Sequence, residues 1–120
     1  MIAAAGNHLK IFSGGAMRPL IVDLVPLFER ARDAIVDVEF RLTSALKQAI
    51  EAGAIFDLVI MPRPDLDELI ARGAVAPGTA CDIAHSSVGL AVRTGAPKPD
   101  IGSVAALRQV LLQARSLACL

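Results

Sequence analysis

At 120 residues, the chain is long enough for one compact domain and too short for two full ones. Hydrophobic residues make up 54% of it, which is enough for a core. Its 12 basic and 12 acidic residues give a net charge of zero, so the net charge does not indicate a nucleic-acid or polyanion partner. No apolar run approaches the roughly 20 residues of a membrane-spanning helix, and the first residues lack the basic and apolar regions of an export signal.

The first predicted unit is a strand, a tight turn and a helix. Residues 9–12 alternate as a strand does, and the glycines of residues 13–15 then break the pattern. The apolar residues of the helix recur at helical spacing, namely Leu20, Ile21, Leu24, Leu27 and Phe28. Pro19 suits the first helical turn, whereas Pro26 is expected to kink the helix near its end.

Two similar units follow. Residues 35–40 are predicted to form a strand, with Thr43 and Ser44 as cap candidates for a short helix. That helix is expected to pack three apolar side chains before Gly53 ends it, namely Leu46, Ala49 and Ile50. Residues 56–60 are a largely apolar run typical of a buried parallel strand, and residues 65–72 are predicted to be the next helix.

The last part of the chain is predicted to hold more strands and one helix. Residues 81–84 and 88–93 are strand candidates, and a helix is expected from about residue 103 to residue 114. An apolar stretch at residues 117–120 is interpreted as a final strand. Strands alternating with helices through short connections predict an α/β fold, with a mostly parallel sheet covered on both faces.

Two loops are candidates for binding a ligand. Ligands of parallel sheets collect at the carboxyl ends of the strands, where free N–H groups of helix N-termini face outward. The first loop offers Gly14, where the backbone can approach a ligand closely, and the neutral hydroxyl of Ser13. The second offers Thr43 and Ser44. Each hydroxyl alone is more typical of a helix cap, but adjacent loops bring both to one edge, which predicts a neutral anion pocket.

Charged side chains near these loops have ordinary explanations. Arg18 and Arg63 are possible ligand-side residues, with a solvated arginine as the more typical alternative. Acidic residues cluster at Asp65, Asp67 and Glu68, where a helix N-terminus favours negative charge, and this interpretation is preferred to a metal site.

No motif for catalysis, metal or cofactor binding is present. Residues 85–87 (HSS) lack a nucleophile elbow and favour a turn, and His8 is expected to be exposed before the first strand. Cys81 and Cys119 match no metal or redox spacing, so two buried thiols that are not bonded to each other are predicted. We therefore expect no enzyme, no metal and no cofactor.

Several segments, taken together, resemble one family. They are residues 9–17 (LKIFSGGAM), 46–53 (LKQAIEAG), 56–60 (FDLVI) and 88–101 (VGLAVRTGAPKPDI). In this order and spacing they resemble the molybdate-type extracellular solute-binding proteins of bacterial ABC import systems. The resemblance implies the first lobe of a type II periplasmic binding-protein fold, cut off early: residues 1–93 as an incomplete first lobe and residues 94–120 as the start of the second.

In that family, two lobes close over an oxyanion held by hydroxyl groups and backbone amides. The resemblance places its first-lobe serine on Ser13 and its second hydroxyl on Thr43 or Ser44. It also implies a periplasmic protein with an ABC permease as partner. The second turn here, residues 41–44 (RLTS), differs from the small residues common in the family, so the ligand is left open between a molybdate-like or tungstate-like oxyanion and a small carboxylate.

Two alternatives to a binding module remain. Some relatives of these proteins isomerise small organic acids such as aconitate, so an isomerase on the same scaffold is one. A truncated remnant without transport function is the other. Because the apolar stripe of residues 103–114 and the stretch at residues 117–120 would lack a complete core, we also expect the C-terminal region to fold back or to exchange in a homodimer.

Overall fold

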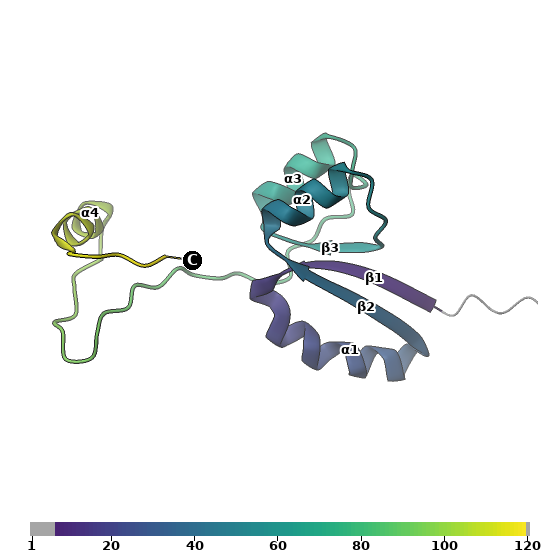
Figure 1. Ribbon diagram of the computed structural model, residues 1–120, viewed down its shortest axis with the longest axis horizontal. Helices are drawn as coiled ribbons and strands as arrows, with labels where there is room; N and C mark the ends of the chain where they lie inside the picture. The colour runs from purple at the N-terminus through teal and green to yellow at the C-terminus, as the bar shows by residue number, and fades with distance from the viewer. Residues whose placement is uncertain (1–6, 120) are drawn as a thin grey trace, which may run out of the picture. The chain divides into compact units, whose positions relative to one another are not determined.

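The computed structural model describes residues 7–119 and divides the chain into two compact units, Met1–Ile83 and Ala84–Leu120. The first unit contains, in order, β1 (Asn7–Gly14), the 3-10 helix η1 (Gly15–Met17), α1 (Arg18–Arg32), β2 (Ala34–Arg41), α2 (Thr43–Glu51), β3 (Leu58–Ile60) and α3 (Arg63–Ala71). The second unit contains α4 (Val104–Gln113) (Figure 1). The lobe boundary expected after residue 93 falls within the second unit and stays a prediction.

The three strands form one parallel sheet in the order β2-β1-β3. In this register Ser13 of the central strand lies beside Phe40 of β2 and Ile60 of β3. Figure 1 shows α1 on one face of the sheet and α2 and α3 on the other. The predicted α/β class, with helices on both faces of a parallel sheet, is confirmed.

The third strand is shorter than the apolar run of residues 56–60 predicts. Asp57, directly before β3, pairs with Lys10 through both its backbone and its side chain: its amide donates to the Lys10 carbonyl oxygen at 2.9 Å, and its carboxylate accepts from the Lys10 amide at 2.8 Å. The Asp57 carboxylate thus takes the place of a backbone carbonyl as the acceptor for the Lys10 amide. The regular hydrogen-bond ladder between β1 and β3 therefore starts only at Leu58.

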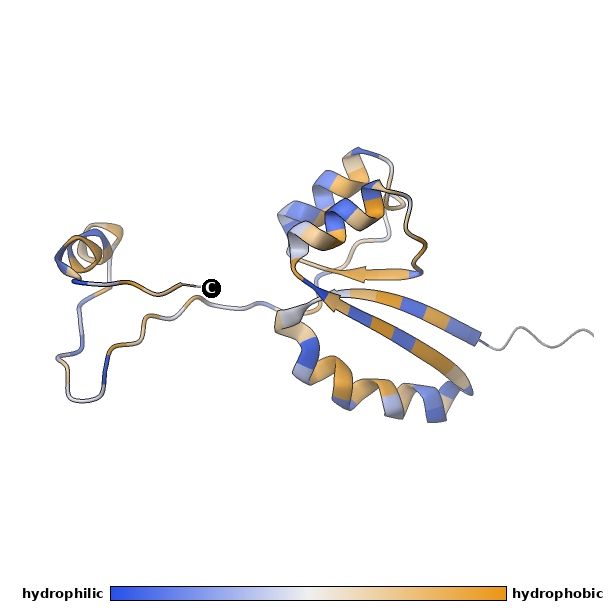
Figure 2. Cartoon of the chain, viewed as in Figure 1, coloured by the Kyte–Doolittle hydropathy of each residue, from blue (hydrophilic) through white to orange (hydrophobic). Residues whose placement is uncertain are grey.

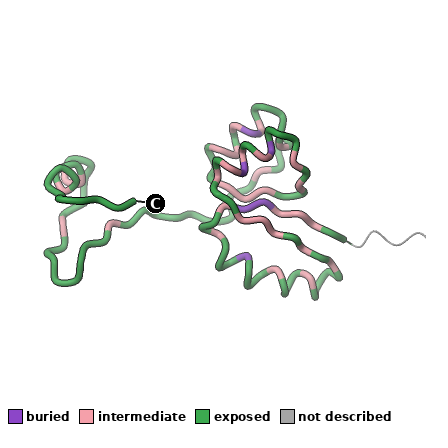
Figure 3. The backbone as a smooth tube through the Cα atoms, in the orientation of Figure 1, coloured by how far each residue is buried: buried purple, intermediate pink, exposed green. Residues whose placement is uncertain are grey.

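The hydrophobic core lies between the sheet and the α2 and α3 helices. Phe12 of β1 is buried there with Leu46 and Ile50 of α2 and Leu69 of α3, as Figure 3 shows. Phe56 stacks on Phe12 with ring centroids 5.4 Å apart. The predicted packing of α2 through residues four apart is confirmed. Because Phe12 is fixed in this core, Gly14 two residues later is held beside the start of α2.

The first helix connects β1 to β2 as predicted. It begins at Arg18 with Pro19 in its first turn, and it continues through Pro26 to Arg32. Pro26 is exposed, so the carbonyl group that its missing N–H leaves without a donor can be hydrated. Asp33 then takes a left-handed conformation (φ 49°), which aspartate tolerates, and β2 starts at the next residue.

The strands predicted at residues 81–84 and 88–93 are wrong, because both segments are irregular in the structure. A strand needs a neighbour to pair with, and within the described residues neither segment pairs with β1, β2 or β3, and Val88 is fully exposed. Residues 117–119 likewise form no strand, and residue 120 lies outside the described range. The predicted helix from residue 103 is confirmed as α4, capped by Ser103, whose hydroxyl accepts from the Ala106 amide at 3.1 Å.

The two cysteines are free, as predicted, but the prediction that they are buried is wrong. Cys81 and Cys119 are both exposed, because each lies in an irregular segment that packs against no core. Within residues 7–119, no helix combines the length and the apolar character that crossing a bilayer requires.

Candidate functional site

The carboxyl ends of the three strands meet at one edge of the sheet, and Gly14 lies at their centre. A Cβ atom placed on Gly14 would lie 3.9 Å from the Thr43 hydroxyl oxygen and 3.9 Å from the Ile60 carbonyl oxygen. Thr43 follows the end of β2, and Ile60 is the last residue of β3. The end of β1 therefore lies against the ends of both neighbouring strands. The expected convergence of the first two loops is therefore present, and β3 joins them.

Three helices begin at this edge, and no side chain caps any of them. The N-cap positions are Met17 for α1, Leu42 for α2 and Pro62 for α3, and none provides a side-chain hydrogen bond. The prediction that Thr43 or Ser44 caps α2 is wrong: both lie inside the helix, because the chain turns at Leu42. The first N–H groups of an α-helix have no partner within the helix, so this edge presents uncapped donors with the positive ends of helix dipoles.

The hydroxyl side chains of the edge differ in accessibility. Ser13 is fully buried, and its hydroxyl donates to the Gly14 carbonyl oxygen at 3.0 Å. Thr43 is half-buried and lies against Gly14, whereas Ser44 is exposed. Thr43 is thus the best placed of the three to meet a ligand directly, and Ser13 supports the backbone beneath Gly14.

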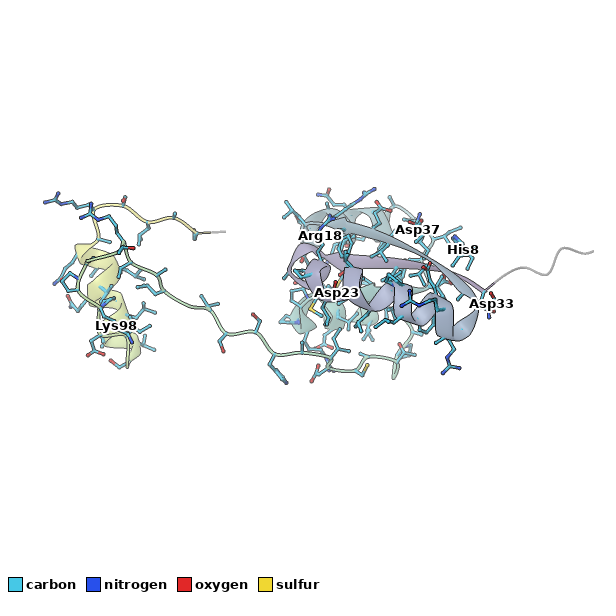
Figure 4. The ribbon with its side chains drawn as sticks, turned by 90° about the horizontal axis from the view of Figure 1, so that it is seen from below. His8, Arg18, Asp23, Asp33, Asp37 and Lys98 are labelled. Atoms are coloured by element: carbon cyan, nitrogen blue, oxygen red, sulfur yellow. The ribbon has the colours of Figure 1, made fainter. Side chains whose placement is uncertain are left out.

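Two arginines flank the edge. The Arg18 guanidinium lies over the Phe40 ring, 4.2 Å from its centroid, at the point where β1 passes into α1. Figure 4 shows Arg18 and His8 at opposite ends of the sheet. Arg41, the last residue of β2, stands beside Gly14 in the register and pairs with Glu39. Sequence reasoning missed Arg41 as a candidate, although the final residue of a parallel strand always lies at this edge.

The second arginine expected near the ligand, Arg63, is occupied elsewhere. Its guanidinium donates to Asp67 at 2.8 Å and to Asp82 at 3.2 Å. The hydrogen bond to Asp67, followed by that to Asp82, raises the pKa of Arg63. Although Arg63 opens α3 at the same sheet edge, its charge is neutralised by these two carboxylates.

Two acidic residues of α3, Asp65 and Glu68, form ion pairs with Lys47 of α2, whereas Asp67 pairs with Arg63 of its own helix. Lys47 of α2 contacts Glu68 and also Asp65, the latter at 3.2 Å, and Arg72 bridges Glu68 to Glu51. The hydrogen bond from Lys47, followed by the charge of Arg72, lowers the pKa of Glu68, and the same bond to Glu68 raises the pKa of Lys47. This network joins the two helices that carry the core.

The described part of the first unit has a shallow pocket and a larger one. A shallow one of about 400 Å³ has Thr43 and Ser44 at its start and otherwise follows the α2–α3 ion pairs. A larger one of about 630 Å³ runs beside β3 and is lined mostly by apolar residues between Ala54 and Ile83. Its lining includes one carboxylate, that of Asp57, and no lysine, arginine or histidine, so its charge does not favour an anion.

No acid–base or metal chemistry gathers at the strand ends among the described residues. His8 is exposed, as expected, but it lies within β1 as its second residue and not before the strand. It is therefore at the opposite end of the sheet from Gly14. His85 is exposed in an irregular segment. Within residues 7–119, no three histidine, cysteine or acidic side chains are grouped in a way that could hold a metal ion.

Comparisons with known proteins identify the family of the chain. The family model described as bacterial extracellular solute-binding protein matches residues 9–118. An aconitate isomerase from a Pseudomonas species is 32% identical over 115 residues, which cover 92% of this chain and 44% of that relative, so this chain spans less than half the length of the relative. The family match extends over β1, the Gly14 edge and every helix described above, and the chain belongs to the bacterial extracellular solute-binding protein family.

Proposed function

We propose that this chain binds a small anion at the carboxyl edge of its sheet, as the ligand-capturing component of an ABC import system. The observation that carries the proposal is the position of Gly14, whose missing side chain leaves an opening bordered by the Thr43 hydroxyl and the Ile60 carbonyl. Membership of the solute-binding family supports ligand binding, and the uncapped helix N-termini support a negatively charged ligand.

In this proposal the backbone amides that follow Gly14 at the start of η1, and those at the start of α2, donate to the anion. Thr43 adds its hydroxyl group, and Ser44 its amide in the first turn of α2. Ser13 reaches the ligand only if its hydroxyl turns away from the Gly14 carbonyl, so its first role is to hold the loop. Because these donors are neutral, the positive charge comes from the helix dipoles and from the arginines at the rim.

We infer a small carboxylate as the favoured ligand, with molybdate-like or tungstate-like oxyanions as the alternative. Arg18 and Arg41 both stand at the edge, and a planar guanidinium matches a planar carboxylate in two-pronged geometry. Arg41 must share its charge between the ligand and Glu39, since the two already form an ion pair. The similarity to a protein named for aconitate, a tricarboxylate, supports the same class.

Calorimetric titration tests the proposal. The ligands are cis-aconitate, trans-aconitate, citrate, sulfate, molybdate and tungstate, each added to the purified 120-residue chain. Thr43→Val keeps the shape of the side chain and removes the hydroxyl group, so it should weaken binding about tenfold. Thr79→Val is the matched control, because the exposed Thr79 hydroxyl bonds only to the Ala76 carbonyl in its own turn. Equal affinity of the Thr43 variant and the wild type would place the ligand elsewhere.

An isomerase of small organic acids is the second candidate, and the aconitate isomerase relative favours it. Isomerisation of aconitate requires a base that removes a proton and an acid that returns one. Glu39 of β2 lies two residues before the end of its strand and is engaged by Arg41. The test is nuclear magnetic resonance of cis-aconitate incubated with the chain: formation of the trans isomer, lost in Glu39→Gln, would establish this candidate in place of simple binding.

Family membership also supports a proposal for the partner and the location. We propose an ABC permease as the protein partner and the periplasm as the location, since extracellular solute-binding proteins deliver ligands captured outside the cell. A truncated remnant without transport function is the competing interpretation, and it predicts no saturable binding of any of the six ligands.

A further inference from the structure

The end of β2 carries charged side chains on one face of the sheet and apolar side chains on the other. Side chains alternate along a strand, and residues beside each other in a parallel register share a face. Figure 2 shows hydrophilic residues alternating with hydrophobic ones along β2. Glu39 lies beside Phe12, which is buried in the core with residues of α2 and α3, and Arg41 lies beside Gly14. Glu39 and Arg41 therefore stand on the face that α2 and α3 cover.

The opening at Gly14 is on the same face. A Cβ placed on Gly14 would lie 3.9 Å from the Thr43 hydroxyl oxygen in the first turn of α2, so the missing side chain faces that helix. Arg18 belongs to the other face, because its guanidinium lies over the ring of Phe40, which precedes Arg41 in the alternation of β2. Of the two arginines at this edge, Arg41 is the one on the side of the opening.

Arg41 is paired with a carboxylate of the chain itself. Its guanidinium contacts Glu39, whose position on the strand is about 7 Å farther from the edge. Neighbouring strands lie about 4.8 Å apart, a distance that an extended arginine side chain exceeds, so the guanidinium can reach either Glu39 or the opening at Gly14.

Glu39 has a second positive partner. The Lys10 Nζ atom lies 3.9 Å from the second carboxylate oxygen of Glu39, on the neighbouring strand. If Arg41 turns toward the edge, Glu39 keeps this partner and is not left as an unpaired charge. The arrangement of Lys10, Glu39 and Arg41 therefore allows Arg41 to change partners at low cost.

We propose that Arg41 selects the ligand by exchanging the Glu39 carboxylate for a carboxylate of the ligand. This inference rests on the proposed anion site at Gly14 and assigns its charge recognition to one residue. A ligand carboxylate at the opening offers the guanidinium the same planar group that Glu39 offers. Glu39 is then an internal competitor, which holds Arg41 in place while the site is empty and lowers the affinity for the ligand.

Calorimetric titration of the 120-residue chain with trans-aconitate in about 0.15 M salt tests the exchange. Arg41→Gln should weaken binding about 10- to 100-fold, because a charge-assisted pair is lost, and Arg41→Lys should recover only part, because lysine lacks the planar fork. Glu39→Gln should tighten binding about two- to fivefold, because Arg41 is then free in every molecule. In the Arg41→Gln background, Glu39→Gln should change the affinity by less than about twofold.

Asp37→Asn is the matched control, because it removes the same charge from the same face of β2. Asp37 lies four residues from Arg41, about 13 Å along the strand, and salt screens charges beyond about 8 Å at this ionic strength. Figure 4 shows Asp37 between Arg18 and His8, away from the carboxyl edge. This variant should bind like the wild type, and far-ultraviolet circular dichroism checks that each variant is folded.

Nuclear magnetic resonance of the arginine side chains provides a second measurement. The Arg41 Nε–H signal should shift when trans-aconitate is added, and in Glu39→Gln it should shift without any ligand. A wild type that binds trans-aconitate and is weakened by Thr43→Val, but not by Arg41→Gln, would overturn this inference and leave the anion site in place. So would equal tightening by Asp37→Asn and Glu39→Gln. A wild type that binds none of the six ligands would overturn the proposed function, and this inference with it.

Discussion

Replacing Gly14 by alanine separates stability from ligand binding. Gly14 has φ −62° and ψ 147°, an extended conformation that alanine also adopts, and the added methyl group would lie at ordinary van der Waals distance, 3.9 Å, from its two nearest atoms. The folded structure can therefore accommodate alanine at position 14 without strain. Since alanine has fewer conformations in the unfolded chain than glycine, we expect the free energy of unfolding to rise by about 0.4 to 1 kcal/mol.

Binding should respond in the opposite direction. The new methyl group fills the opening between Thr43 and Ile60, so an anion can no longer approach the Gly14 backbone. Losing one hydrogen bond to a charged ligand costs about 1.5 to 3 kcal/mol, which is about a 10- to 100-fold loss of affinity. Calorimetry with the best of the six ligands measures it, and urea unfolding measures the stability.

Gly15→Ala is the matched control, because a Cβ placed on Gly15 meets nothing within 4 Å apart from its neighbours in the chain. This variant should gain similar stability and keep the affinity of the wild type. The reasoning is refuted if Gly14→Ala binds as tightly as the wild type, or if both alanine variants lose affinity equally.

Three further predictions concern the fold and its charges. Leu46→Ala, which empties a fully buried core position, should lower the free energy of unfolding by about 2 to 5 kcal/mol, whereas Leu42→Ala, at a position 77% exposed, should change it by less than about 0.5 kcal/mol in urea titrations. The Glu68 carboxylate, with its pKa lowered below the ordinary 4.5, stabilises the fold at neutral pH and loses this effect as the pH falls through the lowered pKa. The stability difference between wild type and Glu68→Gln should therefore be present at pH 7 and disappear in acid well below pH 4.5; a difference independent of pH would contradict the assignment. Thiol reagents should titrate Cys81 and Cys119 in the folded, unreduced chain, and a failure of both to react would contradict their exposure.

The parts of the fold that the sequence predicted are those in which local pattern and packing agree. The apolar spacing of Leu46 and Ile50 predicted the buried face of α2, and the structure buries both. The helix expected from about residue 103 begins at Val104, where the Ser103 hydroxyl gives the helix start a local partner. The two loops expected at one sheet edge meet at Gly14, since parallel strands with right-handed crossovers place their loops on the same side.

The errors arose where structure depends on distant partners. Residues 88–93 have the composition of a strand, but a strand exists only if another strand offers hydrogen bonds, and the sequence pattern does not state whether one does. Arg63 was considered for the ligand because it follows a strand, yet Asp82, 19 residues later, binds it. The burial predicted for Cys81 failed for the same reason, because burial requires a surface to pack against.

The central claim, an anion site at the Gly14 edge, is tested most directly by amide nuclear magnetic resonance of the 15N-labelled chain during titration with trans-aconitate. The account predicts saturable shifts of the amide signals of Gly14, Gly15, Thr43 and Ser44, at the end of β1 and the first turn of α2, with the signals of α4 unchanged. Shifts confined to the apolar pocket beside β3, or no saturable shift with any of the six ligands, would contradict it.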